Sequence, residues 1–144
     1  MKILVSACLL GENCKYDGGN NYHEAVAALG GEHELVPVCP EALGGLPTPR
    51  IPSEIVGETV MTRDGEDVDV QFREGAQRAL DIALEAGVDL AVLQPRSPSC
   101  GVKQVYDGTF TGHKLAGKGV FAQLLEERGI PAIEPDDLAQ CRRL

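Results

Sequence analysis

The stretch 88–101, VDLAVLQPRSPSCG, is the most informative part of the sequence for the architecture. Residues 89–94 form a short apolar run between turn-forming residues, which is typical of a strand buried in a parallel sheet. The run ends in a turn rich in proline and serine, and Cys100 follows that turn. Because this thiol lies just past the end of a buried strand, the positions of the other cysteines become informative.

Two further apolar runs end in the same way. Residues 3–9 are predicted to form a strand with Cys8 near its end, and residues 34–39 a strand that stops at Cys39, before a proline. A last short strand is expected at 130–134. Each run lies between segments that are typical of helices or turns.

The helices are expected between these strands. Apolar residues at three- and four-residue spacing predict an amphipathic helix from residue 70 that ends at Gly87. Shorter helices are expected at 22–31, 120–129 and 136–144. Strands that alternate with helices favour an α/β fold: a single-domain, Rossmann-like open parallel sheet over residues 1–144, with helices on both faces.

Long loops are expected at the carboxyl ends of the strands, where such sheets bind their ligands. The segment 41–58 is too rich in proline and glycine for a regular element, and 105–119 is expected to be a glycine-rich loop. A tight hairpin turn is predicted at Asp64 and Gly65.

The bulk properties exclude several classes of protein. A net charge of -9 argues against nucleic acid or an anionic membrane as the main partner. The apolar run at residues 2–10 is interpreted as a strand and not as a signal peptide, and no run is as long as a membrane helix. Five cysteines, an odd number without secretory context, favour a reducing cytoplasm over a disulfide framework.

The carboxyl ends of parallel strands share one edge of a sheet, so Cys8, Cys39 and Cys100 are expected to lie together. Three interpretations are open. The thiols are small buried hydrophobes, or ligands of a metal or cluster with an open coordination position, or part of a thiol-based catalytic site. Spacing is weak evidence for a metal site, because no two cysteines form a CxxC pair. It is also weak for thiol catalysis, because none of the three histidines shows a local pairing signature; His113 lies in the glycine-rich loop.

Three blocks of this sequence resemble a known bacterial family. They are VSACLLGENCKYDGG (5–19), PVCPEALGGLPTPRIPSEI (37–55) and SPSCGVKQVYDGTFTG (97–112). Together they are similar to the domain-of-unknown-function family 523, whose members include thiouracil desulfurases. The resemblance covers about residues 2–135, nearly the whole chain.

The resemblance implies a [4Fe-4S] cluster bound by Cys8, Cys39 and Cys100. The fourth iron then has no protein thiolate and is expected to take the sulfur of the substrate. The family's acid–base residues correspond to Glu41 and Ser97, with Ser99 as an alternative for the serine. An open iron polarises a carbon–sulfur bond as a Lewis acid, and a nearby carboxylate moves protons.

The implied function is that of a redox-neutral desulfurase. It would remove sulfur from a thiolated pyrimidine base or a related small thiocarbonyl compound. One alternative is a sulfur-handling accessory protein that binds a metal or cluster without turnover. Another is a small-molecule-binding domain with unligated cysteines.

Four more residues are assigned from their surroundings. Cys14 is expected to be a loop thiol without a ligand role, and Cys141 to be incidental. Arg50 could bind an anion or carbonyl of the substrate or pair with an acidic side chain, and the ion pair is favoured. The family often has a lysine near Gln94, and here Arg96 is expected to supply that charge.

Overall fold

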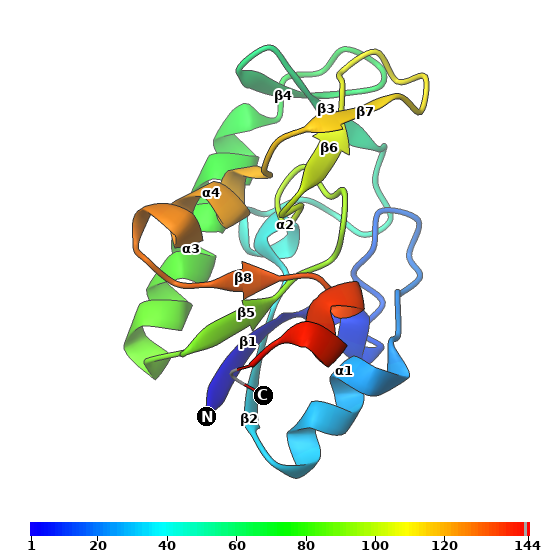
Figure 1. The fold of residues 1–144 in the computed structure, drawn as a ribbon. Helices are drawn as coiled ribbons and strands as arrows, with labels where there is room; N and C mark the ends of the chain where they lie inside the picture. The colour runs from blue at the N-terminus through cyan, green and yellow to red at the C-terminus, as the bar shows by residue number, and fades with distance from the viewer. Residues whose placement is uncertain (143) are drawn as a thin grey trace.

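A four-stranded parallel sheet forms the centre of the molecule in the computed structural model, which describes residues 1–142 and 144. Its strands are β1 (Lys2–Ser6), β2 (Glu34–Val38), β5 (Leu90–Val92) and β8 (Ala132–Ile133), in the order β2-β1-β5-β8 (Figure 1). All three pairings are parallel. The predicted open parallel sheet is therefore confirmed, with each strand shorter than expected.

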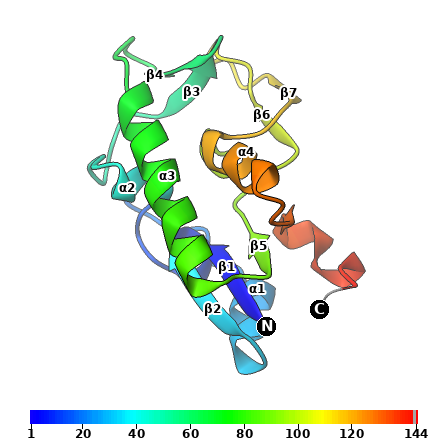
Figure 2. The same ribbon diagram turned by 90° about the vertical axis from the view of Figure 1, so that its left-hand side faces the viewer.

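Helices cover both faces of this sheet (Figures 1 and 2). Leu4 of β1 packs in a core with α3 (Asp69–Ala86) and α4 (Val120–Glu127). Its neighbours Ile3 and Val5 point to the other face, where α1 (Glu24–Ala28) covers them. This alternation along one strand is the pattern of a strand buried on both sides.

Three of the four predicted helices are present, with changes at their ends, and the terminal one is a 3₁₀ helix instead. Helix α3 ends at Gly87, which has a left-handed φ of 69°, as expected. The expected helix 22–31 is α1 followed by the 3₁₀ helix η2 (Leu29–Gly31). The terminal segment forms the 3₁₀ helix η3 (Pro135–Gln140) and no α-helix in the part that is described; residue 143 of the prediction lies outside it. Among residues 1–142 and 144, no helix has the length and apolar character needed to cross a membrane.

The first strand ends earlier than predicted. Strand β1 stops at Ser6, and residues Ala7–Leu10 form the 3₁₀ helix η1. Gly11, with φ of 95°, closes this turn by donating its backbone N–H to the carbonyls of Ala7 and Cys8. Glycine adopts this backbone easily, so the chain turns here although the apolar run continues. Cys8 therefore lies on a tight turn just past the strand.

The expectation that 41–58 and 105–119 lack regular structure was wrong. The first segment contains most of α2 (Pro40–Leu43) and all of β3 (Ser53–Val56), which pairs with β4 (Thr59–Thr62). The second contains most of a hairpin of β6 (Gln104–Tyr106) and β7 (Lys114–Ala116). The two hairpins lie side by side at one end of the molecule (Figures 1 and 2). Their glycines and prolines occupy turns between very short elements. Composition alone cannot distinguish such a segment from an irregular loop.

The predicted turn at Asp64 and Gly65 is confirmed. Gly65 has a φ of 82° and donates its N–H to the carbonyl of Thr62. An antiparallel bridge between Met61 and Asp67 closes the turn.

Helix α2 is fixed to α3 by direct contact of their backbones. A Cβ atom on Gly75 would lie 1.8 Å from the carbonyl oxygen of Pro40, and one on Gly44 would lie 1.9 Å from that of Gln71. No side chain larger than hydrogen fits either place. This close packing sets the position of the residues on either side of Pro40, which are Cys39 and Glu41.

Candidate active site

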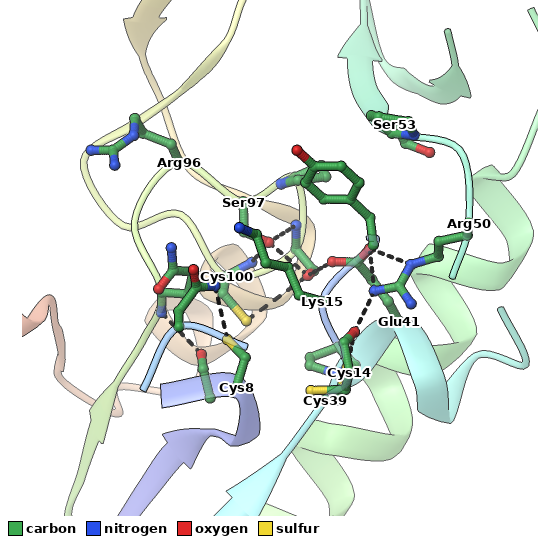
Figure 3. A pocket seen from close by; sticks show the side chains of 18 of the residues that line it. Cys8, Cys14, Lys15, Cys39, Glu41, Arg50, Ser53, Arg96, Ser97 and Cys100 are labelled. Carbon is green, nitrogen blue, oxygen red and sulfur yellow. Dashed lines mark hydrogen bonds and ion pairs between the residues drawn. The ribbon is translucent and has the colours of Figure 1, made fainter. Parts of the chain in front are cut away.

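A cavity of about 530 Å³ lies beyond the carboxyl ends of the strands. Cys8, Cys39 and Cys100 all line it, although they are far apart in the sequence (Figure 3). The predicted meeting of these three thiols is therefore confirmed as geometry. Their role as ligands of a cofactor stays a prediction.

Each thiol is positioned by the element that ends beside it. Cys8, on η1, accepts a hydrogen bond from Asn21 Nδ2 at 3.5 Å. Cys39 is the residue at the N-cap of α2, so its position follows the contact of α2 with α3. Cys100 is buried behind the turn that follows β5. All five cysteines of the chain are free thiols.

A fourth thiol, that of Cys14, also lines the cavity. Cys39 Sγ donates to the backbone carbonyl of Cys14 at 3.9 Å. The Cys14 side chain is the first cause that lowers the pKa of Cys8 and of Cys39 to about 7. The pKa of Cys14 itself is raised, first by the Cys39 side chain, then by the Cys8 side chain and by burial. Burial raises the pKa of Cys100 to about 12. Sequence reasoning placed Cys14 on a loop and had no signal for this position between two other thiols.

Glu41 is the carboxylate of the cavity and has a partner on each oxygen. Ser99 Oγ donates to Oε2 at 3.1 Å. The Nε and Nη2 atoms of Arg50 both lie 3.2 Å from Oε1. The expected ion pair of Arg50 with an acidic side chain is thus confirmed (Figure 3).

The Arg50 guanidinium is fully engaged. Its side chain is only 7% exposed. Besides Glu41, it donates to the carbonyl of Cys14 at 2.9 Å, to that of Pro47 at 3.1 Å and to Thr48 Oγ1 at 3.0 Å. A guanidinium has five N–H groups in a planar fork, and here four of them donate hydrogen bonds, while Nη2 also lies within ion-pair distance of Glu41. Arg50 therefore joins the Cys14 loop to helix α2, which carries Glu41.

The two serines near Cys100 have different contacts. Ser99 is 1% exposed and its hydroxyl touches Glu41 directly. Ser97 Oγ lies 3.0 Å from Ser99 Oγ and accepts the backbone N–H groups of Ser99 and Cys100. Ser97 thus holds the turn and is one hydrogen bond further from the carboxylate. Ser99, which the sequence analysis gave as the alternative to Ser97, is therefore the serine in contact with Glu41.

Of the other residues named in the sequence analysis, some line the cavity and some do not. Arg96 lines the cavity, and its guanidinium has no hydrogen-bond or ion-pair partner among the described residues. His113 is exposed, bonds to Thr111, and does not line the cavity. Tyr16 and Tyr106 both line the cavity.

The donor set fits an iron–sulfur cluster better than a single metal ion. Within the described part of the chain, no three His, Cys, Asp or Glu side chains are placed to bind one metal ion. A single zinc ion needs all its ligands about 2.0–2.3 Å from one point. A cubane cluster spreads its thiolates over different irons, so the sulfurs need not converge on one point. The cavity has four free thiols, and thiols are the soft donors that such a cluster takes.

The fold and the cavity together define a class: a small α/β protein with a thiol-lined pocket at the carboxyl edge of a parallel sheet. Comparison with known proteins makes this specific. The model of the 2-thiouracil desulfurase family matches residues 3–137, and the chain belongs to this family.

Two similar proteins agree with this assignment. A Bacillus subtilis (strain 168) protein, the uncharacterized YbbK, is 41% identical over 146 residues, which is 94% of this chain and 97% of that protein. The structure of the [4Fe-4S]-dependent thiouracil desulfidase TudS (DUF523Vcz) superposes with a TM-score of 0.91. It is 44% identical, and the match covers 96% of this chain and 93% of that one.

Proposed function

We propose that this protein is a [4Fe-4S]-dependent desulfurase that acts on thiouracil or a closely related small thiolated pyrimidine. The reaction replaces C=S by C=O: one water is consumed, one hydrogen sulfide is released, and no atom changes its oxidation state. Membership of the 2-thiouracil desulfurase family and the likeness to TudS support this activity. The contact between Glu41 and Ser99 beside three thiols is the structural observation that carries it.

The proposed ligands of the cluster are Cys8, Cys39 and Cys100. When bound, the cluster supplies a Lewis-acidic iron that polarises the carbon–sulfur bond. Three thiolates leave one iron without a protein ligand. The cavity gives a small planar substrate room beside these residues.

Glu41 is the proposed general base. Its carboxylate lines the cavity, where it can accept a proton from the water that attacks the thiocarbonyl carbon. Ser99 donates to Oε2 and can return a proton toward the departing sulfur. Ser97 extends the same chain of hydroxyl groups by one step. Arg50 holds the other oxygen of Glu41 and so fixes the direction of the carboxylate.

A reducing cytoplasm is the proposed location. Five free thiols support it, since an oxidising compartment pairs or modifies such groups. The three proposed cluster ligands also need a reducing compartment, because they must stay free thiols to bind the cluster.

The experiment that tests the function is anaerobic reconstitution followed by a turnover assay. About four irons and four sulfides per chain are expected, with release of sulfide and uracil from 2-thiouracil in equal amounts. Glu41→Gln keeps the size of the side chain and its hydrogen-bond acceptor. It is expected to lower kcat by about 10²- to 10⁴-fold while the iron content is unchanged.

Two other outcomes would favour the alternatives. A protein that binds a full cluster but turns over no thiolated pyrimidine would be a cluster-binding accessory protein. If the protein stays colourless and free of iron after reconstitution, both the proposed cluster and the proposed mechanism are wrong.

A further inference from the structure

The backbone has two strained residues, and both line the cavity. Among the described residues, Arg96 and Phe110 are the only non-glycine residues with positive φ, at 62° and 58°. Large side chains rarely adopt this left-handed conformation, because Cβ approaches the neighbouring carbonyl. Residues of this kind persist only where the surrounding structure enforces them, and they cluster at functional sites.

Phe110 is held in this conformation from another part of the chain. It lies in the turn between β6 and β7, and Glu54 comes from β3. Glu54 Oε1 accepts the backbone N–H of Gly108 at 3.0 Å and that of Phe110 at 3.1 Å. A Cβ on Gly108 would lie 2.7 Å from the carbonyl oxygen of Ile55, so the turn is packed directly against β3. The turn, and not the phenyl ring, sets the backbone at residue 110.

The phenylalanine side chain at position 110 is therefore present although it strains the backbone. Glycine or asparagine would adopt the same backbone more easily and leave the two hydrogen bonds to Glu54 intact. A phenylalanine that serves only as a turn residue has no physical reason to be here. Phe110 is one of the residues that line the cavity, which gives it one.

Aromatic side chains are scarce in this protein and concentrated at this cavity. The chain has three tyrosines, three phenylalanines and no tryptophan. Phe72 and Phe121 are buried in the core, and Tyr22 is exposed elsewhere. The remaining three, Tyr16, Tyr106 and Phe110, all line the cavity. A wall of aromatic rings suits a flat heteroaromatic ligand, since every such ring offers a π face.

We propose that Phe110 stacks on the planar ring of the substrate and makes this site selective for cyclic, heteroaromatic thiocarbonyl compounds over acyclic ones. Glu54 acts as the positioning residue that holds Phe110 at the cavity. This inference rests on the proposed desulfurase function and adds the residue that recognises the ring.

The test compares Phe110→Asn, Phe110→Leu and Phe110→Tyr with the wild type. Asparagine tolerates the left-handed backbone and removes the ring. Leucine keeps apolar bulk and the same strain, also without a ring. Tyrosine keeps the ring and is the conservative variant. Tyr22→Ala removes an exposed aromatic outside the cavity and serves as the control.

Two readouts are used. The first is the Kd of uracil, the reaction product, measured by anaerobic calorimetry on the chain as isolated and after reconstitution. The second is the pair kcat and KM, measured with thiouracil and with thiourea, which lacks a ring. Iron content is measured for every variant.

The asparagine and leucine variants are expected to bind uracil more weakly and to need more thiouracil for half-saturation. Both Kd and KM should rise by about 5- to 100-fold, the range of base–aromatic stacking. Their kcat is expected to stay within about twofold, with iron content and thiourea kinetics unchanged. The tyrosine and Tyr22→Ala variants are expected to match the wild type.

Unchanged uracil affinity in both ring-free variants would overturn the proposal, and so would a wild type that binds no uracil. An equal loss on thiourea would overturn the selectivity for rings. A wild type that binds uracil but turns over no thiouracil would reject the proposed function, and the binding series would still decide the role of Phe110.

Discussion

The carboxylate of Glu41 is divided between two partners: Ser99 Oγ lies 3.1 Å from one oxygen and the Arg50 guanidinium lies 3.2 Å from the other. Glu41 lies on α2, Arg50 comes from the loop that follows α2, and Ser99 comes from the turn after β5. The pair of contacts therefore joins two distant parts of the chain at the cavity. It also leaves the carboxylate with one fixed orientation, which suits a group that moves protons.

This relationship predicts different effects for the two serines. Ser99→Ala removes the hydroxyl that touches Glu41, so kcat is expected to fall by at least about tenfold with little change in KM. Ser97→Ala removes the acceptor of two backbone N–H groups and is expected to destabilise the fold by about 1–3 kcal/mol. Steady-state kinetics and urea unfolding separate the two. A larger loss of kcat for Ser97→Ala, at unchanged stability, would make Ser97 the catalytic serine.

Arg50 is expected to support both stability and activity. Arg50→Ala leaves a mostly buried carboxylate with one partner and two carbonyls without their donor, at a cost of about 3 kcal/mol. Arg50→Lys keeps the charge but not the planar fork, so it is expected to recover only part of that loss. Urea unfolding gives the free energies. A change below about 0.5 kcal/mol for Arg50→Ala would show that the ion pair is not a structural support.

Much of this site follows from the sequence because it follows from topology. Apolar runs with helices between them predict a parallel sheet, and a parallel sheet brings its strand ends to one edge. Cys8, Cys39 and Cys100 could therefore be placed together without a structure. Glu41 was assigned from the resemblance to the family, and its position two residues after Cys39 agrees with its place near the thiols.

The rest depends on local geometry that no pattern encodes. Ser97 and Ser99 are two residues apart on one turn, and only the capping of N–H groups by Ser97 decides which hydroxyl reaches Glu41. The sequence has 22 acidic residues, and no pattern in it indicates which of them pairs with Arg50. Phe110 reaches the cavity because Glu54 holds its turn. Both residues lie in segments that were predicted to be loops from their glycines and prolines but contain short hairpins.

The contact between α2 and α3 predicts a sharp difference between two glycines. Gly75→Ala places a Cβ 1.8 Å from the carbonyl oxygen of Pro40, so α2 must shift. The expected destabilisation is about 1–3 kcal/mol, with a loss of activity because α2 carries Glu41. Gly31→Ala is the control, because its Cβ would meet nothing within 4 Å. Equal unfolding free energies for the two variants would contradict this account of the packing.

The C-terminal segment gives a prediction on pH. The pKa of Asp137 is lowered, first by its hydrogen bond from Lys103 at 2.7 Å and second by one from the backbone N–H of Glu134. A carboxyl group whose pKa is lower in the folded state favours folding above its unfolded pKa of about 3.9 and loses that contribution as pH falls through the folded value.

Asp137→Asn is therefore expected to be less stable than the wild type at pH 7. The difference should shrink as pH falls below about 4. Urea unfolding of both proteins at a series of pH values measures it. A difference that stays constant over this range would mean that Asp137 acts through its shape and not through its charge.

The four thiols of the cavity give a test of the cluster ligands with an internal control. Cys8→Ser, Cys39→Ser and Cys100→Ser are each expected to lose most of the iron that the reconstituted wild type binds, because a hydroxyl is a poor ligand for iron in a cluster. Cys14→Ser changes a thiol in the same cavity, in contact with two of the others, and is expected to keep about four irons per chain. Iron and sulfide analysis with the visible spectrum measures this. Loss of iron from Cys14→Ser equal to the other three would make Cys14 a fourth ligand and close the open iron that the proposed reaction needs.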